Sequence, residues 1–193
     1  MSATVSFRQM KDGTREDYQL LGQFEHDYAQ ALPDRLLAAL GRLDTGLAGY
    51  PLSRLGHSLQ TATRALRDGA DTELVVAALV HDVGDDLAPY NHAELAAAIL
   101  RPYVRAEVTW IVEQHGLFQS YYYAHHYDRD RNGRERFRGH RWFDACAAFC
   151  ERWDQASFDP SYASEPLERF VPLVREVFGR TAHDPRYVGT SGA

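Results

Sequence analysis

Cysteine and long apolar runs are both scarce in this sequence of 193 residues. The two cysteines, Cys146 and Cys150, lie one helical turn apart, a spacing that favours partly buried thiols over a disulfide. No window approaches the apolar length of a membrane-spanning helix, and the N-terminal segment MSATVSFRQMKDGTREDY lacks the apolar centre of a signal peptide. We therefore expect a cytoplasmic protein with no membrane partner.

Basic residues are too few and too scattered for a protein whose main ligand is a phosphate backbone. The chain carries 21 Lys and Arg against 27 Asp and Glu, with a formal net charge of -6 and no sustained basic block. Nucleic acid is therefore excluded as the main partner. The length fits one domain with one site, for which a small molecule is the expected ligand. Monomer and homodimer both remain open.

Signals for β-strands are almost absent, whereas apolar residues recur at spacings of three and four along most of the chain. This periodicity predicts an all-α fold with helices over 16–32, 33–46, 52–69, 71–83, 91–101, 104–115 and 142–155. The charged stretch 128–141 is expected to be a loop or mobile flap. We expect one helical bundle, with residues 1–49 as an added N-terminal extension, 50–160 as the core, and 161–193 as a C-terminal helix and tail.

Residue types that bind metals recur near the inward faces or the ends of the predicted helices. The candidate ligands are the imidazoles of His57, His81, His92 and His115 and the carboxylates of Asp82 and Asp154. Helical bundles build metal sites from facing helices in this way. Asp82 lies beside a hydrophobic helix face, where a carboxylate is costly unless it is paired or bound to metal. An aspartate able to bridge two ions distinguishes a dinuclear site from a single structural zinc.

Over residues 50 to 160 the order H…HD…H…H…D resembles that of the HD-domain superfamily of metal-dependent enzymes. The matching segments are GHSLQTATRAL with His57, AALVHDVGD with His81 and Asp82, YNHAELAAAIL with His92, IVEQHG with His115, and ERWDQ with Asp154. The resemblance implies two ions. His57, His81, Asp82 and Asp154 would hold one, and Asp82, His92 and His115 would hold the other, with Asp82 as the bridge.

Two dinuclear branches of that superfamily share such a ligand set. One is the phosphodiesterases of the HD-GYP type, which use both ions to clamp phosphoryl oxygens and to generate a hydroxide nucleophile. The other is the mixed-valent diiron oxygenases, exemplified by myo-inositol oxygenase and the phosphonate-cleaving HD enzymes. In these, an Fe(II)/Fe(III) pair chelates a hydroxylated substrate and activates O₂. The ligands alone do not choose between the two branches.

Residues next to the ligands favour the oxygenases. HD-GYP enzymes typically read HDIGK after the doublet, whereas this chain reads HDVGD, and the carboxylate of Asp85 repels phosphate. The phosphonate cleavers carry a histidine at the position of Asp85, a lysine at that of Gln119 and a glutamate at that of Tyr50, so their substrate is not carried over. Tyr50 is interpreted either as a phenol lid or weak ligand at the metals, or as a packing side chain.

The aromatic segment FQSYYYAHH after His115 supplies candidate substrate contacts. Tyr121, Tyr122 or Tyr123 could line a pocket with His126 as a polar contact, although packing against the N-terminal helices explains the tyrosines as well.

Arginines further along the chain are a second source of contacts. Arg138 and His140 fit either a flap over the site or a solvated loop. Arg152, two residues before Asp154, is expected near the metal carboxylate as a substrate clamp or a structural ion pair. Together with Asp85, these arginines favour a zwitterionic substrate.

The sequence therefore predicts an HD-domain oxygenase with two iron ions that oxidises or cleaves a small hydroxylated polar or zwitterionic molecule with O₂. The alternative is a phosphohydrolase that acts on a nucleotide or phosphate ester with Mn or another divalent metal. A third hypothesis is a degenerate HD domain that serves as a sensor or interaction module, but no ligand is missing from this chain.

Overall fold

The computed structural model describes residues 4–189 and contains, within that range, nine α-helices and no β-strand. The expected all-α fold is therefore confirmed. The α-helices are α1 (Arg15–Gln30), α2 (Leu32–Arg42), α3 (Arg54–Arg67), α4 (Thr72–Val80), α5 (His92–Leu100), α6 (Ala106–Gln119), α7 (Phe143–Phe149), α8 (Leu167–Phe178) and α9 (Pro185–Val188). Shorter segments are η1 (Met10–Asp12), η2 (Ser120–Tyr122), η3 (Ala124–Tyr127), η4 (Gly133–Phe137) and the π-helical η5 (Cys150–Asp154). None of the helices in residues 4–189 has the length and apolar character needed to cross a bilayer.

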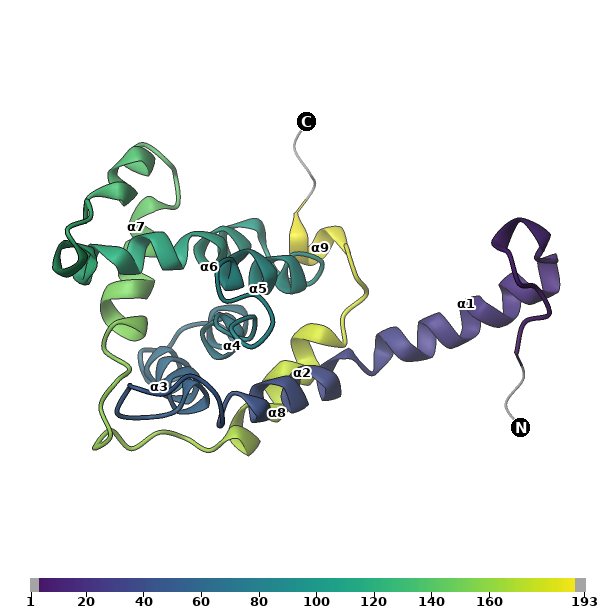
Figure 1. The fold of residues 1–193 in the computed structure, drawn as a ribbon, viewed down its shortest axis with the longest axis horizontal. Coiled ribbons are helices and arrows are strands. Elements are labelled where there is room, and N and C mark those ends of the chain that lie inside the picture. Colours follow the sequence, from purple (N-terminus) through teal and green to yellow (C-terminus); the bar gives the residue numbers. More distant parts are fainter. Residues whose placement is uncertain (1–3, 190–193) are drawn as a thin grey trace.

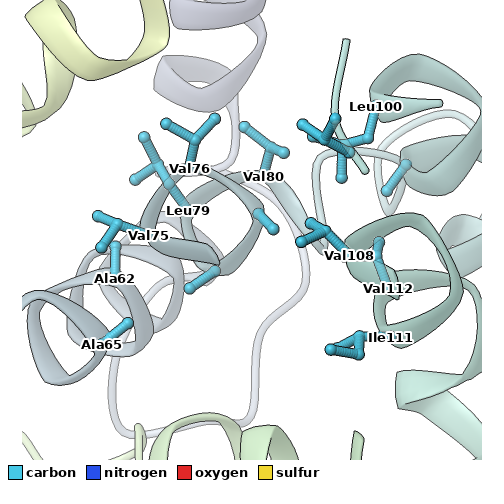
Figure 2. Close-up of a cluster of buried hydrophobic side chains, with 14 of the residues drawn as sticks. Ala62, Ala65, Val75, Val76, Leu79, Val80, Leu100, Val108, Ile111 and Val112 are labelled. Atoms are coloured by element: carbon cyan, nitrogen blue, oxygen red, sulfur yellow. The ribbon is translucent and has the colours of Figure 1, made fainter. Parts of the chain in front are cut away.

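Helix α4 is the centre of the fold because it is apolar on every side. Its sequence is TELVVAALV, and every residue from Val75 to Val80 is buried. A helix of this composition must be surrounded by other elements. Figure 2 shows its side chains between those of α3 on one side and those of α5 and α6 on the other, and α8 packs on α4 as well.

The helix that leads to the His81-Asp82 doublet is shorter than expected. The sequence predicted a helix to residue 83, but α4 ends at Val80, so the doublet lies on the tight turn that follows. Gly84 is required in this turn, because a Cβ atom there would lie 2.8 Å from the carbonyl oxygen of His92. The close approach fixes the doublet against the start of α5.

The helix that leads to Asp154 changes its hydrogen-bond pattern before it reaches that residue. Helix α7 passes at Cys150 into η5, where the amide of Gln155 donates to the carbonyl of Cys150 at 3.0 Å. The wider π-helical turn changes the direction of Asp154 relative to a regular helix, a device often found at functional sites. The sequence predicted a regular helix here, and it predicted a loop over 128–141, where the structure has η4. Cys146 and Cys150 are buried free thiols, as expected.

Helix α1 projects from the body of the molecule as an arm (Figure 1). A capping box specifies its start: the Asp17 amide donates to the Thr14 hydroxyl at 3.2 Å, and the Asp17 carboxylate accepts from the Thr14 amide at 3.1 Å. Asp17 is the only buried residue of α1. Helix α2, in contrast, contributes Leu36 and Leu40 to the core beside α8. The segment before residue 50 therefore divides into a packed helix and a projecting one.

Replacement of Leu79 by alanine tests whether α4 is the centre of the core. Leu79 is fully buried, so its truncation should lower the free energy of unfolding by roughly 2–5 kcal/mol. The control is Leu87→Ala, which removes a side chain that is 75% exposed and should change stability by less than about 0.5 kcal/mol. Urea titration followed by circular dichroism measures both values. Equal losses in the two variants would contradict the packing described.

Candidate metal centre

Four imidazoles and two carboxylates, supplied by separate elements, converge below the surface. The contributing residues are His57 in α3, His81 and Asp82 in the turn after α4, His92 at the start of α5, His115 in α6, and Asp154 at the end of η5. All but His92 are almost fully buried, and the His92 side chain is 23% exposed. The structure thus brings together the whole set of candidate ligands from the sequence.

The carboxylate of Asp82 divides these imidazoles into two groups. Its Oδ2 atom lies 3.5 Å from Nε2 of His57 and 3.4 Å from Nε2 of His81. Its Oδ1 atom lies 3.4 Å from Nε2 of His92 and 3.2 Å from Nε2 of His115. One carboxylate therefore presents a different oxygen to each pair of histidines, which is the arrangement that a bridging ligand requires.

Asp154 joins the first of these two groups. Its Oδ1 atom lies 3.2 Å from Nε2 of His57 and 3.7 Å from Nε2 of His81. The amide of Gln119 donates to the same oxygen at 3.0 Å. The other oxygen, Oδ2, is buried and has no hydrogen-bond partner among the described residues. A buried carboxylate oxygen without a partner is costly unless a cation lies against it.

Backbone carbonyls fix the orientation of three of the imidazoles. Nδ1 of His57 lies 2.9 Å from the carbonyl of Ser157, and Nδ1 of His81 lies 2.9 Å from that of Ala78. Nδ1 of His115 is 2.6 Å from the carbonyl of Val112. Each Nδ1 must donate its proton to these acceptors, which leaves the Nε2 lone pair free to bind a metal.

The convergence of these acceptors requires positive charge between them. Nε2 of His57 and Nε2 of His81 are only 3.1 Å apart, and two lone pairs at that distance repel each other. Imidazole nitrogen and carboxylate oxygen together suit transition-metal ions. Ligand atoms lie close enough for an ion in three groups. These are His57 with His81 and Asp154, His81 with Asp82 and His115, and Asp82 with Asp85 and His92. The residues present fit metal ions.

Protons would supply the same charge in the absence of metal. Burial by itself lowers the pKa of His57, but the hydrogen bond to Asp154 and the charge of Asp82 outweigh it and raise that pKa above 6.5. Burial also lowers the pKa of His81, but the charge of Asp82 outweighs it, so the pKa of His81 is raised as well. At Asp82 and Asp154, burial is outweighed by the facing histidines, which hold both pKa values well below the usual 3.8.

Asp85 does not face the pocket as a separate charge. Its Oδ2 atom accepts from Nε of Arg54 at 2.5 Å, and its Oδ1 atom lies 3.1 Å from Nδ1 of His92. Arg54 also reaches Oδ2 of Asp82 at 3.4 Å. Asp85 therefore lies behind His92, a place from which carboxylates in metal sites orient the imidazole and raise its basicity, and Nδ1 of His92 is not aligned for a hydrogen bond to it in this structure. The sequence interpretation of Asp85 as a group that repels substrate phosphate is corrected, because its charge is paired with Arg54.

A cavity of about 400 Å³ opens onto the candidate ligands. Gln119, Arg54 and Tyr123 contribute to its wall, together with Tyr50, Tyr127 and Phe158. Phe158 stacks on His57 with ring centroids 4.5 Å apart, and Tyr50 stacks on Phe158 at 5.2 Å. Tyr50 is thus part of the cavity wall and packs on an aromatic ring at the same time.

Other residues proposed from the sequence lie away from the cavity. His126 is exposed and its ring packs on His125, because η3 directs it to the surface. Arg152 forms an ion pair with Asp68 at 2.8 Å and is 56% exposed, so it is a structural pair on the outer side of η5 and not a substrate clamp. Neither residue lines the cavity.

The charged segment after η3 also keeps its polar groups away from the cavity. Arg138 pairs with Glu135 in the same short helix. The ring of His140 stacks on Trp110 with centroids 4.1 Å apart. Of the tyrosines in the aromatic segment, Tyr123 lines the cavity, whereas Tyr121 lies between the guanidinium groups of Arg131 and Arg134.

Sequence reasoning missed Arg54, Phe158 and Tyr127 in the cavity wall. Arg54 precedes His57 by three residues on the same helix, so helical spacing could have placed it on the same face. Phe158 lies in an irregular segment and Tyr127 at the end of the short helix η3, and no periodicity points to them.

Replacement of Asp85 by asparagine tests its role behind His92. The variant should bind metal at the His92 and His115 side about 10–100-fold more weakly, while the other side keeps its affinity. The matched control is Asp86→Asn, which removes the adjacent carboxylate that pairs with Arg42 on the surface. Metal titration with analysis of bound metal per chain measures both. Equal affinities in the two variants would contradict this role.

The histidine and carboxylate pKa shifts predict how the metal-free protein responds to pH. Raised histidine pKa values add stability that is full below pH 6.5 and is lost as the pH rises through the folded-state values. Lowered carboxylate pKa values add stability that is full above pH 3.8 and is lost as the pH falls. The Tm of protein treated with a chelator should therefore be highest between these limits, and added metal should remove the decline on the alkaline side. If the Tm of the metal-free protein increased as the pH was raised beyond 6.5, the result would contradict this assignment.

Comparison with known proteins gives two matches. The chain is similar to a [1-hydroxy-2-(trimethylamino)ethyl]phosphonate dioxygenase (glycine-betaine-forming) of Leisingera caerulea, with 31% identity over 91 residues. That match covers 42% of this chain and 46% of the relative, so less than half of the relative's length is spanned. The family model of the HD domain matches residues 54–155, a range that contains all six candidate ligands. The protein belongs to the HD domain family.

Proposed function

We propose that this protein is a dinuclear iron oxygenase that oxidises or cleaves a small hydroxylated polar or zwitterionic molecule with O₂. The division of the Asp82 carboxylate between two pairs of histidines supports a dinuclear site, and the similarity to a dioxygenase supports its use with O₂. His57, His81 and Asp154 would hold one iron with Oδ2 of Asp82, and His92 and His115 would hold the other with Oδ1. The bound iron pair would supply the activation of O₂. Monomer or homodimer is compatible with this chemistry.

The protein's own residues would hold and shield the substrate. The cavity wall combines the guanidinium of Arg54, which also pairs with Asp85 and Asp82, with the rings of Tyr50, Tyr123 and Tyr127. A guanidinium suits an anionic group, and aromatic rings suit apolar or cationic groups. A zwitterion fits such a wall. The name of the Leisingera relative describes a phosphonate with a hydroxyl and a trimethylamino group, which supports this class of substrate.

A metal-dependent phosphohydrolase is the second candidate, with Mn or another divalent metal and a nucleotide or phosphate ester as substrate. The Nη1 group of Arg54 in the cavity wall favours it, because it can donate to a phosphate oxygen while Nε and Nη2 pair with Asp85 and Asp82. The position of Asp85 no longer argues against it, since that carboxylate is paired. The similarity to a dioxygenase is what favours the oxygenase.

Electron paramagnetic resonance of the partly oxidised, iron-loaded protein distinguishes the two functions. The oxygenase predicts an antiferromagnetically coupled Fe(II)/Fe(III) signal that changes when a hydroxylated phosphonate zwitterion is added, together with consumption of O₂. His92→Ala combined with His115→Ala should remove one of the two metals and the coupled signal. The control is His126→Ala, which replaces a surface histidine and should keep both. Release of phosphate from a generic ester, without O₂ consumption or a coupled signal, would favour the hydrolase.

A further inference from the structure

Large apolar side chains are exposed at several places on the described molecule, and two of these places bear on association between copies. One is the arm, helix α1, with its preceding turn: Tyr18, Phe24 and Tyr28 are 40%, 47% and 67% exposed. The other is the rim of the cavity that opens onto the candidate ligands. There, Tyr123 and Tyr127 are 46% and 66% exposed. Exposed apolar side chains that gather in this way mark surfaces that bind another protein.

Helix α1 contacts α2 and the segment before it, where Phe7 stacks on Tyr18 with ring centroids 5.6 Å apart. Leu20, Leu21, Phe24 and Tyr28 follow one another at spacings of one, three and four, so they form a stripe along one side of the helix. An isolated helix of about this length is only marginally stable in water. The capping box specifies the helix, and the exposed stripe indicates that a surface covers it.

The arm and the segment after α6 carry opposite charge. The arm, residues 15–30, holds one arginine against four carboxylates, of which Glu16, Glu25 and Asp27 are exposed. Residues 120–141, which we name the basic segment, hold six arginines against three carboxylates. Arg129 and Arg136 are exposed there and are in no described ion pair. Tyr123 and Tyr127 belong to the same segment, so it offers apolar and cationic groups together.

The two surfaces lie at opposite ends of the molecule. In Figure 1 the arm projects at the right, whereas the chain between α6 and α7 lies at the upper left. The arm therefore does not reach the basic segment of its own chain. Two copies placed antiparallel could exchange arms, and twofold symmetry would form the contact twice.

We propose that this protein forms a twofold dimer in which the acidic arm of each copy docks on the basic segment of the other. The apolar stripe of α1 then covers Tyr123 and Tyr127, and Glu25 and Asp27 face the arginines. Because both tyrosines also line the cavity at the candidate ligands, the partner's arm borders the entrance of that cavity. The proposal rests on surface chemistry and is independent of the metal and of the reaction.

Charge reversal tests the pairing through two complementary variants of the full chain. One variant combines Glu25→Lys with Asp27→Lys, and the other combines Arg129→Glu with Arg136→Glu. Each alone places like charges at both contacts and should be monomeric by sedimentation velocity at concentrations where the parent protein is dimeric. An equimolar mixture should restore a dimer, because the reversed arm of the first variant then meets the reversed segment of the second, and the unchanged arm of the second meets the unchanged segment of the first. Raised ionic strength should weaken the parent dimer.

A control variant and a folding check accompany this test. Glu168→Lys combined with Glu176→Lys makes the same change in charge on exposed positions of α8 and should stay dimeric. Circular dichroism and Tm confirm that all variants fold. Phe24→Ser should also dissociate the dimer by removing part of the stripe. The proposal would be overturned if the parent protein were monomeric or if both reversed variants remained dimeric. It would also be overturned if the mixture stayed monomeric or if the protein grew into open chains.

Discussion

The carboxylate of Asp82 is the constraint on which the rest of the site depends. Its two oxygens lie between two pairs of imidazoles, and it is almost fully buried with them. A buried carboxylate is stable only if cations or donors surround it. The chain meets this requirement by packing the apolar α4 in the centre, so that the turn after it delivers His81 and Asp82 to one place, and by using Gly84 to bring α5 against that turn. Backbone carbonyls then hold three imidazoles with Nε2 inward.

Much of the fold and the whole candidate ligand set could be predicted from the sequence, for different reasons. Helical periodicity identified the all-α class because amphipathic patterns such as that of α2, with Leu36 and Leu40 buried four residues apart, survive local irregularity. The six candidate ligands could be identified because their residue types are costly on inward faces. The π-helical turn before Asp154 and the early end of α4 could not, since both depend on tertiary contacts that leave no local pattern.

The roles of charged residues were the least predictable part. Arg152 was expected near the metal carboxylate, as a substrate clamp or a structural ion pair, because it lies two residues before Asp154. Asp85 was interpreted as a charge facing the substrate because it replaces the lysine of HDIGK. In the structure Arg152 turns outward to Asp68, and Asp85 turns to Arg54 and His92. The partner of a charged side chain often comes from an element far away in the sequence. Sequence spacing alone therefore does not predict it. The same applies to Phe158, whose ring reaches His57 from an irregular segment.

The measurement that tests the central claim most directly is anomalous diffraction at the iron edge from crystals of the iron-loaded protein. If Asp82 bridges two ions, two anomalous peaks should appear, each within bonding distance of a different Asp82 oxygen, one beside His57, His81 and Asp154 and the other beside His92 and His115. A single peak, or two peaks that do not share Asp82, would contradict the account.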